Sequence, residues 1–173
     1  MPAIHQPAPA AADLLLRILR VGNLAFAGMI ATCLVGSYVF EAAVVEYVAS
    51  FSNGLAPMAL LQGLRLLAVV GILSCPLVHV LLTQLLAIVD TVRTRDPFVH
   101  ENAARLKRIA WLLLGVEVLH LGVGGMARWL SATNVEIEWT FSFTGWVAVV
   151  LLFTLAHVFE NGARMRQDLQ GTV

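Results

Sequence analysis

Four long apolar stretches constrain the fold of this chain more than any other feature of its sequence. They cover residues 21–40, 66–89, 109–126 and 140–159. A bilayer core about 30 Å thick needs roughly 20 predominantly apolar residues in helical form. We therefore expect an all-α integral membrane protein, folded as an antiparallel four-helix bundle in which each stretch crosses the lipid bilayer.

The composition agrees with burial in lipid. Of the 173 residues, 59% are hydrophobic and 13% are charged, whereas an average soluble domain is about 45–50% apolar and about 25% charged. The formal net charge is zero, which argues against a basic protein that binds nucleic acid directly. The two cysteines, Cys33 and Cys75, lie in different apolar stretches, so the chain is not a disulfide scaffold.

The N-terminal residues 1–12 are rich in alanine and proline, and we expect them to form a loose leader. Asp13 suits the N-cap position of a helix, so a single four-span membrane domain is expected over residues 13–173. The first apolar stretch is longer than the 7–15 residues that are usual in a cleaved signal peptide. We therefore interpret it as a membrane span.

The basic side chains predict the orientation of the bundle. If the N-terminus lies inside, only Arg65 and Arg128 of the eleven Lys and Arg residues fall on the outer side. The connections are short enough for the positive-inside rule to apply. We therefore expect both termini to be cytoplasmic.

The two outer connections carry different signals. Pro57 suits the first turn of the second long helix. Residues 134–143 alternate between apolar and polar side chains, which is typical of a strand, and a second copy of the chain in a homodimer or the other outer connection could pair with it. The simpler interpretation is an extended entry into the fourth span, with Trp139 and Trp146 at the membrane interface.

Three ionisable residues lie well inside the predicted spans, and a fourth, His157, lies close to the end of the last span. Glu117 and His120 are three residues apart in the third span and therefore project from one helical face. His79 lies near the middle of the second span, which should pack antiparallel beside the third. A charged residue at the bilayer centre costs about 2.5–3.5 kcal/mol on insertion scales and usually faces the bundle interior. We expect the three side chains to meet at similar depth.

This predicted intramembrane cluster of Glu117, His120 and His79 allows three interpretations. A protonated Glu117 could join helices through a hydrogen bond, or the carboxyl and imidazole groups could relay protons or ions, since histidine titrates near neutrality. The third interpretation is a haem or metal site at His79 and His120. Glu-x-x-His resembles half of a di-metal carboxylate site, but the carboxylates and the second Glu-x-x-His of such a site are missing from the other spans.

No segment resembles an exposed nucleophile supported by a base and an orienting acid. We therefore expect no catalytic residues and no cofactor, and a protein that is not an enzyme.

The connection between the second and third spans contains Asp96-Pro97-Phe98 and Asn102, and basic residues follow at Arg105, Lys107 and Arg108. One interpretation is an anchored turn whose basic residues lie among the lipid headgroups, where each gains about 1 kcal/mol from anionic lipid. The alternative is a docking surface for a cytoplasmic protein partner.

This connection and the C-terminal tail together resemble a known family. Asp96-Pro97-Phe98, Asn102 and the run from Arg105 to Trp111 are similar to the family's loop signature of Pro-Phe, a nearby Asn and a Leu-basic-basic-Ile run into the third helix. Asp168, followed by Gly171 and Thr172, is similar to its closing pattern. The family consists of bacterial four-span inner-membrane proteins catalogued as a domain of unknown function. The resemblance covers about residues 14–173.

The resemblance implies a four-helix bundle in the bacterial inner membrane without an assigned activity. Members of the family are often encoded beside a small helix-turn-helix transcription regulator, which implies a membrane component of a regulatory pair. The residues that would dock a cytoplasmic partner are Pro97, Phe98, Asn102, Asp168, Gly171 and Thr172. The alternative function is a redox or proton- and ion-handling membrane protein that uses Glu117, His120 and His79.

Overall fold

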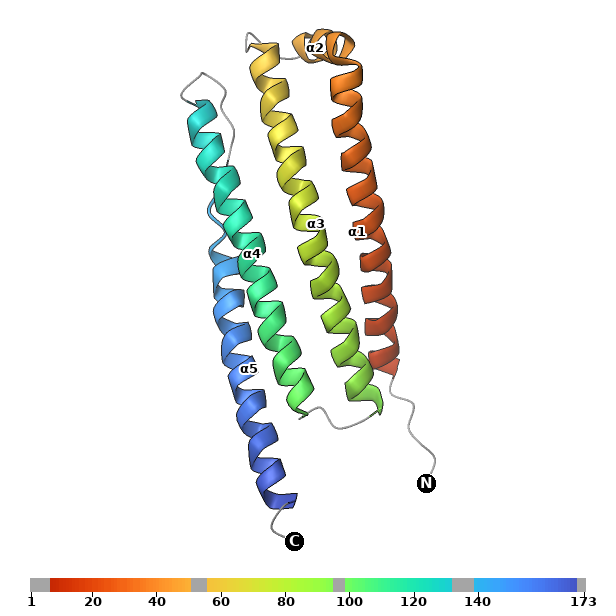
Figure 1. The fold of residues 1–173 in the computed structure, drawn as a ribbon, viewed down its shortest axis with the longest axis vertical. Coiled ribbons are helices and arrows are strands. Elements are labelled where there is room, and N and C mark those ends of the chain that lie inside the picture. Colours follow the sequence, from red (N-terminus) through yellow and green to blue (C-terminus); the bar gives the residue numbers. More distant parts are fainter. Residues whose placement is uncertain (1–6, 51–55, 95–98, 132–138, 171–173) are drawn as a thin grey trace.

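The computed structural model describes residues 7–50, 56–94, 99–131 and 139–170, and these residues are predominantly helical. The helices are α1 (Pro7–Val39), α2 (Glu41–Ala49), α3 (Pro57–Thr94), α4 (His100–Ser131) and α5 (Phe143–Gln170) (Figure 1). All except α2 contain a segment that is long and apolar enough to cross a membrane. The chain is therefore a multi-pass membrane protein of the predicted all-α class.

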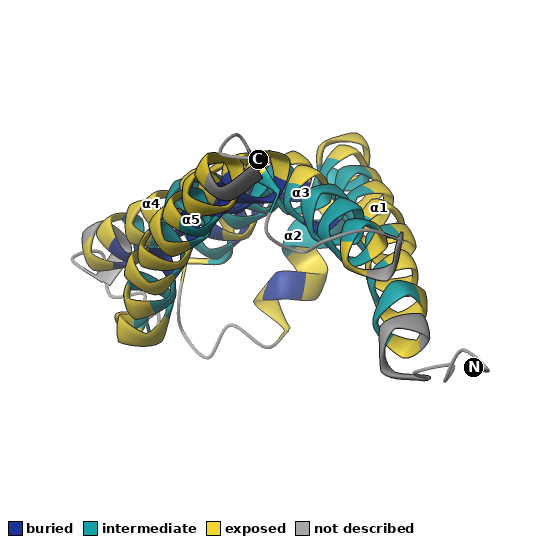
Figure 2. Cartoon of the chain, turned by 90° about the horizontal axis from the view of Figure 1, so that it is seen from below, coloured by how far each residue is buried: buried dark blue, intermediate teal, exposed yellow. Residues whose placement is uncertain are grey.

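The four long helices stand antiparallel and side by side (Figures 1 and 2). The contacts between them give an open row in the order α1, α3, α4 and α5. Each helix packs against its neighbours in this order. Within the described ranges, α1 does not contact α4 or α5, and α3 does not contact α5. The bundle is therefore open, and α3 and α4 each hold two neighbours on different sides.

The ends of the row leave large apolar side chains exposed, as expected for helices that face lipid. Phe26 and Met29 on α1 are exposed, as are Val150 and Leu151 on α5. Lipid tails are as apolar as these side chains, so their exposure to the bilayer carries no hydrophobic penalty. An open row is therefore a stable arrangement in a membrane.

The helix starts agree with the sequence in one place and differ in another. α3 begins at Pro57, as predicted. α1 begins at Pro7 rather than at Asp13, because proline is favoured in a first turn and the alanines that follow are strong helix formers. Asp13 lies inside α1, where its carboxylate accepts a hydrogen bond from Arg17 at 2.9 Å. The prediction of a loose leader is therefore wrong for residues 7–12.

The short helix α2 lies across the end of the bundle where α1 ends and α3 begins (Figure 1). Arg65 of α3 holds this corner together, with only 4% of its surface exposed. Its Nε donates to the Ser37 hydroxyl at 3.1 Å and its Nη2 to Glu41 at 2.9 Å and to the Ser37 carbonyl. The guanidinium also lies over the Tyr38 ring, 3.8 Å from its centroid. A single buried cation thus joins α1, α2 and α3.

Arg65 also marks one end of the apolar part of α3, and Ala87 lies near the other end. The Ala87 carbonyl accepts a hydrogen bond from Arg105 of α4. Residues 65 and 87 are about 33 Å apart along the helix at 1.5 Å per residue, close to the thickness of a bilayer core. We call these two ends of the bundle the Arg65 end and the Arg105 end. The first turn of α1 and the last turn of α5 both lie at the Arg105 end (Figure 1).

The role of Arg65 predicts a marked loss of stability in the R65M variant. The substitution removes the buried donor of several hydrogen bonds, and each bond to a charged group contributes about 1.5–3 kcal/mol. We expect the thermal midpoint in detergent, followed by circular dichroism, to fall by roughly 5 °C or more. The control E41Q should have a smaller effect, because the Glu41 side chain is 45% exposed and exposed ion pairs contribute about 1 kcal/mol or less. Equal midpoints for R65M and the unmodified protein would contradict this role.

Candidate functional site

The buried carboxyl group of Glu117 is the centre of the candidate site. Glu117 is 8% exposed. It lies two residues after Gly115, where an added Cβ would be 3.4 Å from Leu77 of α3. Leu77 is nearly midway between Arg65 and Ala87 along α3. The carboxyl group therefore lies near the middle of the apolar layer. On the other side of α4 it lies directly against Gly145 of α5, where an added Cβ would overlap the carboxyl atoms. The absence of a side chain at Gly145 thus lets the carboxyl group lie against the backbone of α5.

Gly145 belongs to the first turn of α5, and Ser142 caps that turn. The Gly145 N–H donates to the Ser142 hydroxyl oxygen at 3.3 Å, which is the usual bond of an N-cap serine. A helix begins with N–H groups that lack helical acceptors and with the positive end of its dipole. The Glu117 carboxyl group therefore lies beside the capped N-terminal turn of α5.

One oxygen of Glu117 has no hydrogen-bond partner among the described residues. Its Oε2 is buried and accepts no hydrogen bond from the residues that the structure describes. A buried carboxyl oxygen costs free energy unless it is hydrogen-bonded. The site therefore offers this oxygen to a proton, a water molecule or a cation.

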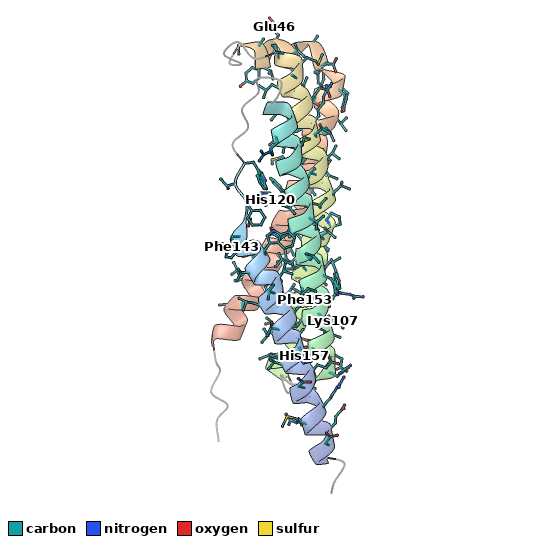
Figure 3. The ribbon with its side chains drawn as sticks, turned by 90° about the vertical axis from the view of Figure 1, so that its left-hand side faces the viewer. Glu46, Lys107, His120, Phe143, Phe153 and His157 are labelled. Atoms are coloured by element: carbon teal, nitrogen blue, oxygen red, sulfur yellow. The ribbon has the colours of Figure 1, made fainter. Side chains whose placement is uncertain are left out.

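The position of Gly145 beside Glu117 means that α5 begins halfway along α4. The half of α4 nearest the Arg65 end extends beyond the start of α5 (Figure 1). His120 and Phe143, at the start of α5, lie at neighbouring depths (Figure 3). Non-helical backbone at membrane depth is tolerated where protein buries it or where water fills a cavity. The residues that lead into α5 therefore need cover from the protein.

Aromatic side chains provide this cover. The Trp139 indole lies on Gly124 of α4, where an added Cβ would overlap the ring. Trp139 also packs edge-on against the His120 imidazole, with 5.6 Å between ring centroids. Phe141 lies 6.4 Å from Trp139 and stacks on Trp146 at 6.4 Å. The aromatic side chains thus connect α4 with the first turn of α5.

This region includes part of the 134–143 segment, whose alternating pattern is typical of a strand. Residues 134–138 of that segment lie outside the described residues. Residues 139–142 are neither strand nor helix, and Phe143 begins α5. The described part therefore agrees with an extended entry into the last helix.

The structure divides the predicted cluster of Glu117, His120 and His79. Glu117 and His120 both face the α5 side of α4, as their contacts with Gly145 and Trp139 show. His79 instead continues the row of Gly71 and Cys75 along α3, since residues four apart share a helical face.

That row faces α1. An added Cβ on Gly71 would meet Ile30 of α1 at 3.2 Å, and the Cys75 carbonyl accepts a hydrogen bond from Asn23 of α1 at 3.0 Å. The Nδ1 of His79 is buried and has no hydrogen-bond partner among the described residues. In an open row the α1 side of α3 and the α5 side of α4 do not meet, which is why His79 lies apart from Glu117.

The different directions of His79 and His120 argue against a haem held by these two residues. Two axial histidines must face a common space, but His79 is directed toward α1 and His120 toward Trp139. The part of the chain that the structure describes also contains no group of three His, Cys, Asp or Glu side chains that could hold a metal ion. The geometry therefore gives the haem and metal interpretations no support.

A second polar network, which the sequence did not predict, joins the end of α3 to the start of α4. Asn102 is completely buried, and its Oδ1 accepts a hydrogen bond from Arg105 at 2.9 Å. The same Arg105 nitrogen donates to the Thr91 hydroxyl at 2.7 Å and to the Ala87 carbonyl at 3.2 Å. From the sequence we expected Arg105 among lipid headgroups and Asn102 in a docking loop. The structure turns both side chains toward α3.

The other predicted docking residues are only partly described. Pro97, Phe98, Gly171 and Thr172 lie outside the described residues. Asp168 lies in the last turns of α5, at the Arg105 end. Docking through this loop and tail stays a prediction, and Asn102 has no exposed surface with which to take part.

Comparison with known proteins places the chain in a family. A model of the family described as "Protein of unknown function (DUF2975)" matches residues 41–173. The match begins at the first residue of α2 and includes α3, α4 and α5. The resemblance was expected from about residue 14, but α1 lies outside the match. No curated protein and no solved structure matches the chain.

Substitutions at two neighbouring glycines of α4 test the contact between Trp139 and this helix. In G124A the new methyl group would overlap the Trp139 ring, and overpacking of this kind costs about 1–3 kcal/mol. In the matched control G125A the methyl group meets no atom of the described residues within 4 Å, so helix propensity should stabilise the protein by up to about 1 kcal/mol. We expect thermal unfolding at a lower temperature for G124A only. A lower midpoint for both variants, or for neither, would show that Trp139 does not occupy this position.

Proposed function

We propose that this chain, which belongs to the DUF2975 family of proteins of unknown function, is the non-enzymatic membrane component of a regulatory pair. It lies in the bacterial inner membrane with both termini in the cytoplasm, and its partner is a helix-turn-helix transcription regulator. The observation that carries the proposal is the far end of α5, which continues beyond the start of α4 at the Arg105 end (Figure 1).

The projecting part of α5 has the features of a protein-binding helix. Glu160 lines the same groove as His100, the first residue of α4, and α5 continues for about 15 Å beyond it. Ala163 is still buried, whereas Met165, two residues further along α5, is 69% exposed and lies between Arg164 and Arg166. Methionine and arginine are enriched in protein–protein interfaces. This end of α5 therefore offers a partner an apolar side chain flanked by positive charge.

The distribution of charge supports the cytoplasmic position of this end. The described basic side chains at the Arg105 end include Arg17, Arg105, Lys107, Arg108, Arg164 and Arg166. The opposite end has Arg65 and Arg128, and Arg65 is buried and paired with Glu41. An excess of Lys and Arg in short connections marks the cytoplasmic side. The partner would therefore meet α5 from the cytoplasm.

The second candidate function is proton or ion handling, and Glu117 is the observation that favours it. Its Oε2 is buried near the middle of the apolar layer without a hydrogen-bond partner among the described residues, and intramembrane carboxyl groups commonly mark proton or ion pathways. His120, one turn away on the same face, is a second proton carrier. The position of His79 on the α1 side removes it from this pathway and leaves redox chemistry without a ligand pair.

The regulatory proposal predicts that the end of α5 is needed to retain the regulator. The full chain, solubilised in detergent, should co-purify with a co-expressed helix-turn-helix regulator. Deletion of residues 168–173 and the substitution M165D should each abolish retention. The control Q167D adds the same charge to the same exposed segment but on a different side of the helix, and it should retain the regulator. Equal retention by all four proteins would contradict the proposal.

The proton-handling candidate makes a separate prediction for E117Q. Reconstituted vesicles with an imposed pH gradient should show proton flux through the unmodified protein, measured with a pH-sensitive dye inside the vesicles. E117Q removes the titratable group with little change in shape and should abolish the flux. The control E101Q changes an exposed glutamate in the first turn of the same helix and should leave the flux unchanged. No flux through the unmodified protein, or equal flux through E117Q, would contradict this candidate function.

A further inference from the structure

A groove of about 380 Å³ lies between α4 and α5 at the Arg105 end. Its apolar floor includes Ala103 and Ala156, which are both buried. The small alanine side chains create the space, because larger residues at these positions would fill the gap between the two helices. Phe153 extends the floor toward the middle of the apolar layer and packs edge-on against Trp111, with 5.3 Å between ring centroids.

The rim of the groove is polar. His100 and Lys107 contribute from α4, and His157 contributes from α5. Lys107, Phe153 and His157 lie along the lower part of the α4–α5 pair (Figure 3). A lysine ammonium offers three hydrogen-bond donors with a full positive charge, and a neutral imidazole offers one N–H donor. Donors from both helices thus surround an apolar floor.

One acidic residue, Glu160, also lines the groove. Its carboxylate accepts a hydrogen bond from Arg164 at 2.8 Å, so a cation outside the groove offsets its charge. Among the described side chains that line the groove, the positive charge of Lys107 therefore has no unpaired acid opposite it. This balance favours an anionic ligand.

The depth of the groove shows where such a ligand would come from. Lys107 follows Arg105, which bonds the Ala87 carbonyl close to the end of the apolar layer. The rim thus lies at the level of the lipid headgroups, and the floor leads from there toward the bilayer centre. Trp111, against Phe153, is 59% exposed and offers an apolar surface to an acyl chain. A soluble phosphate would make no use of this surface.

We propose that this groove binds one anionic phospholipid, with its headgroup phosphate among His100, Lys107 and His157 and its acyl chains along Phe153 and Trp111. Lysine binds phosphate oxygens through charge-assisted hydrogen bonds. The groove holds the lipid between α4 and α5, so binding is specific to this place and not a general attraction of basic residues to the membrane surface. This site is independent of the regulatory function proposed above.

The test uses the purified full chain in neutral detergent, with phosphatidylglycerol as the anionic probe and phosphatidylcholine as the zwitterionic one. Native mass spectrometry measures how much of each lipid is bound. We expect phosphatidylglycerol to bind more tightly, and K107Q to weaken its binding about five- to tenfold. The control R108Q removes the same charge from the next residue, which does not line the groove, and should bind phosphatidylglycerol as the unmodified protein does.

A second variant blocks the space in the groove and leaves its positive charge in place. Ala104 lines the groove and is exposed, so A104W should fill the space without disturbing the packing of the helices and should abolish lipid binding while Lys107 is retained. Circular dichroism should give equal thermal midpoints for A104W, K107Q and the unmodified protein.

Three outcomes would overturn the proposal. Equal loss of binding in K107Q and R108Q would show general electrostatic attraction, and undiminished binding in A104W would place the lipid elsewhere. Displacement of phosphatidylglycerol by millimolar inorganic phosphate would show that the groove recognises free phosphate and not a lipid.

Discussion

The contact between the Glu117 carboxyl group and the first turn of α5 determines much of the remaining structure. Lipid cannot satisfy a carboxyl group, so the protein must enclose it, and it does so with Gly145 and the N-terminal turn capped by Ser142. This contact fixes the start of α5 at the middle of α4. Because α5 has 28 residues, about 42 Å at 1.5 Å per residue, its other end must pass the start of α4 and enter the aqueous side. The position of α5 along α4 therefore explains both the burial of Glu117 and the projecting end of α5.

The sequence predicted the features that depend on hydropathy and local backbone preference. These features include the four spans, the start of α3 at Pro57 and the burial of Glu117. It did not predict the order of packing, because lipid and protein are equally apolar surroundings for a helix and the pattern of apolar residues does not show which side meets a neighbour. His79 and Glu117 were thus expected together, whereas the open row places them on different sides of α3 and α4.

The residues that hold the ends of the bundle were also beyond prediction, for a related reason. Arg65 and Arg105 each bond several groups on neighbouring elements, and several of those acceptors are backbone carbonyls or small hydroxyl groups that have no distinctive sequence pattern. Their charge suggested contact with water or headgroups. In the folded chain these two arginines join neighbouring helices, at levels about one bilayer core apart.

The most direct test of this account is the proximity of α4 and α5 at Glu117. In a background with C33A and C75A, the double variant E117C/G145C should react with a short thiol cross-linker to give one linked species, detected by mass spectrometry after proteolysis. The double variant H79C/G145C should give no linked species, because residue 79 faces α1. Cross-linking of H79C/G145C, or its absence in E117C/G145C, would contradict both the open row and the position of α5.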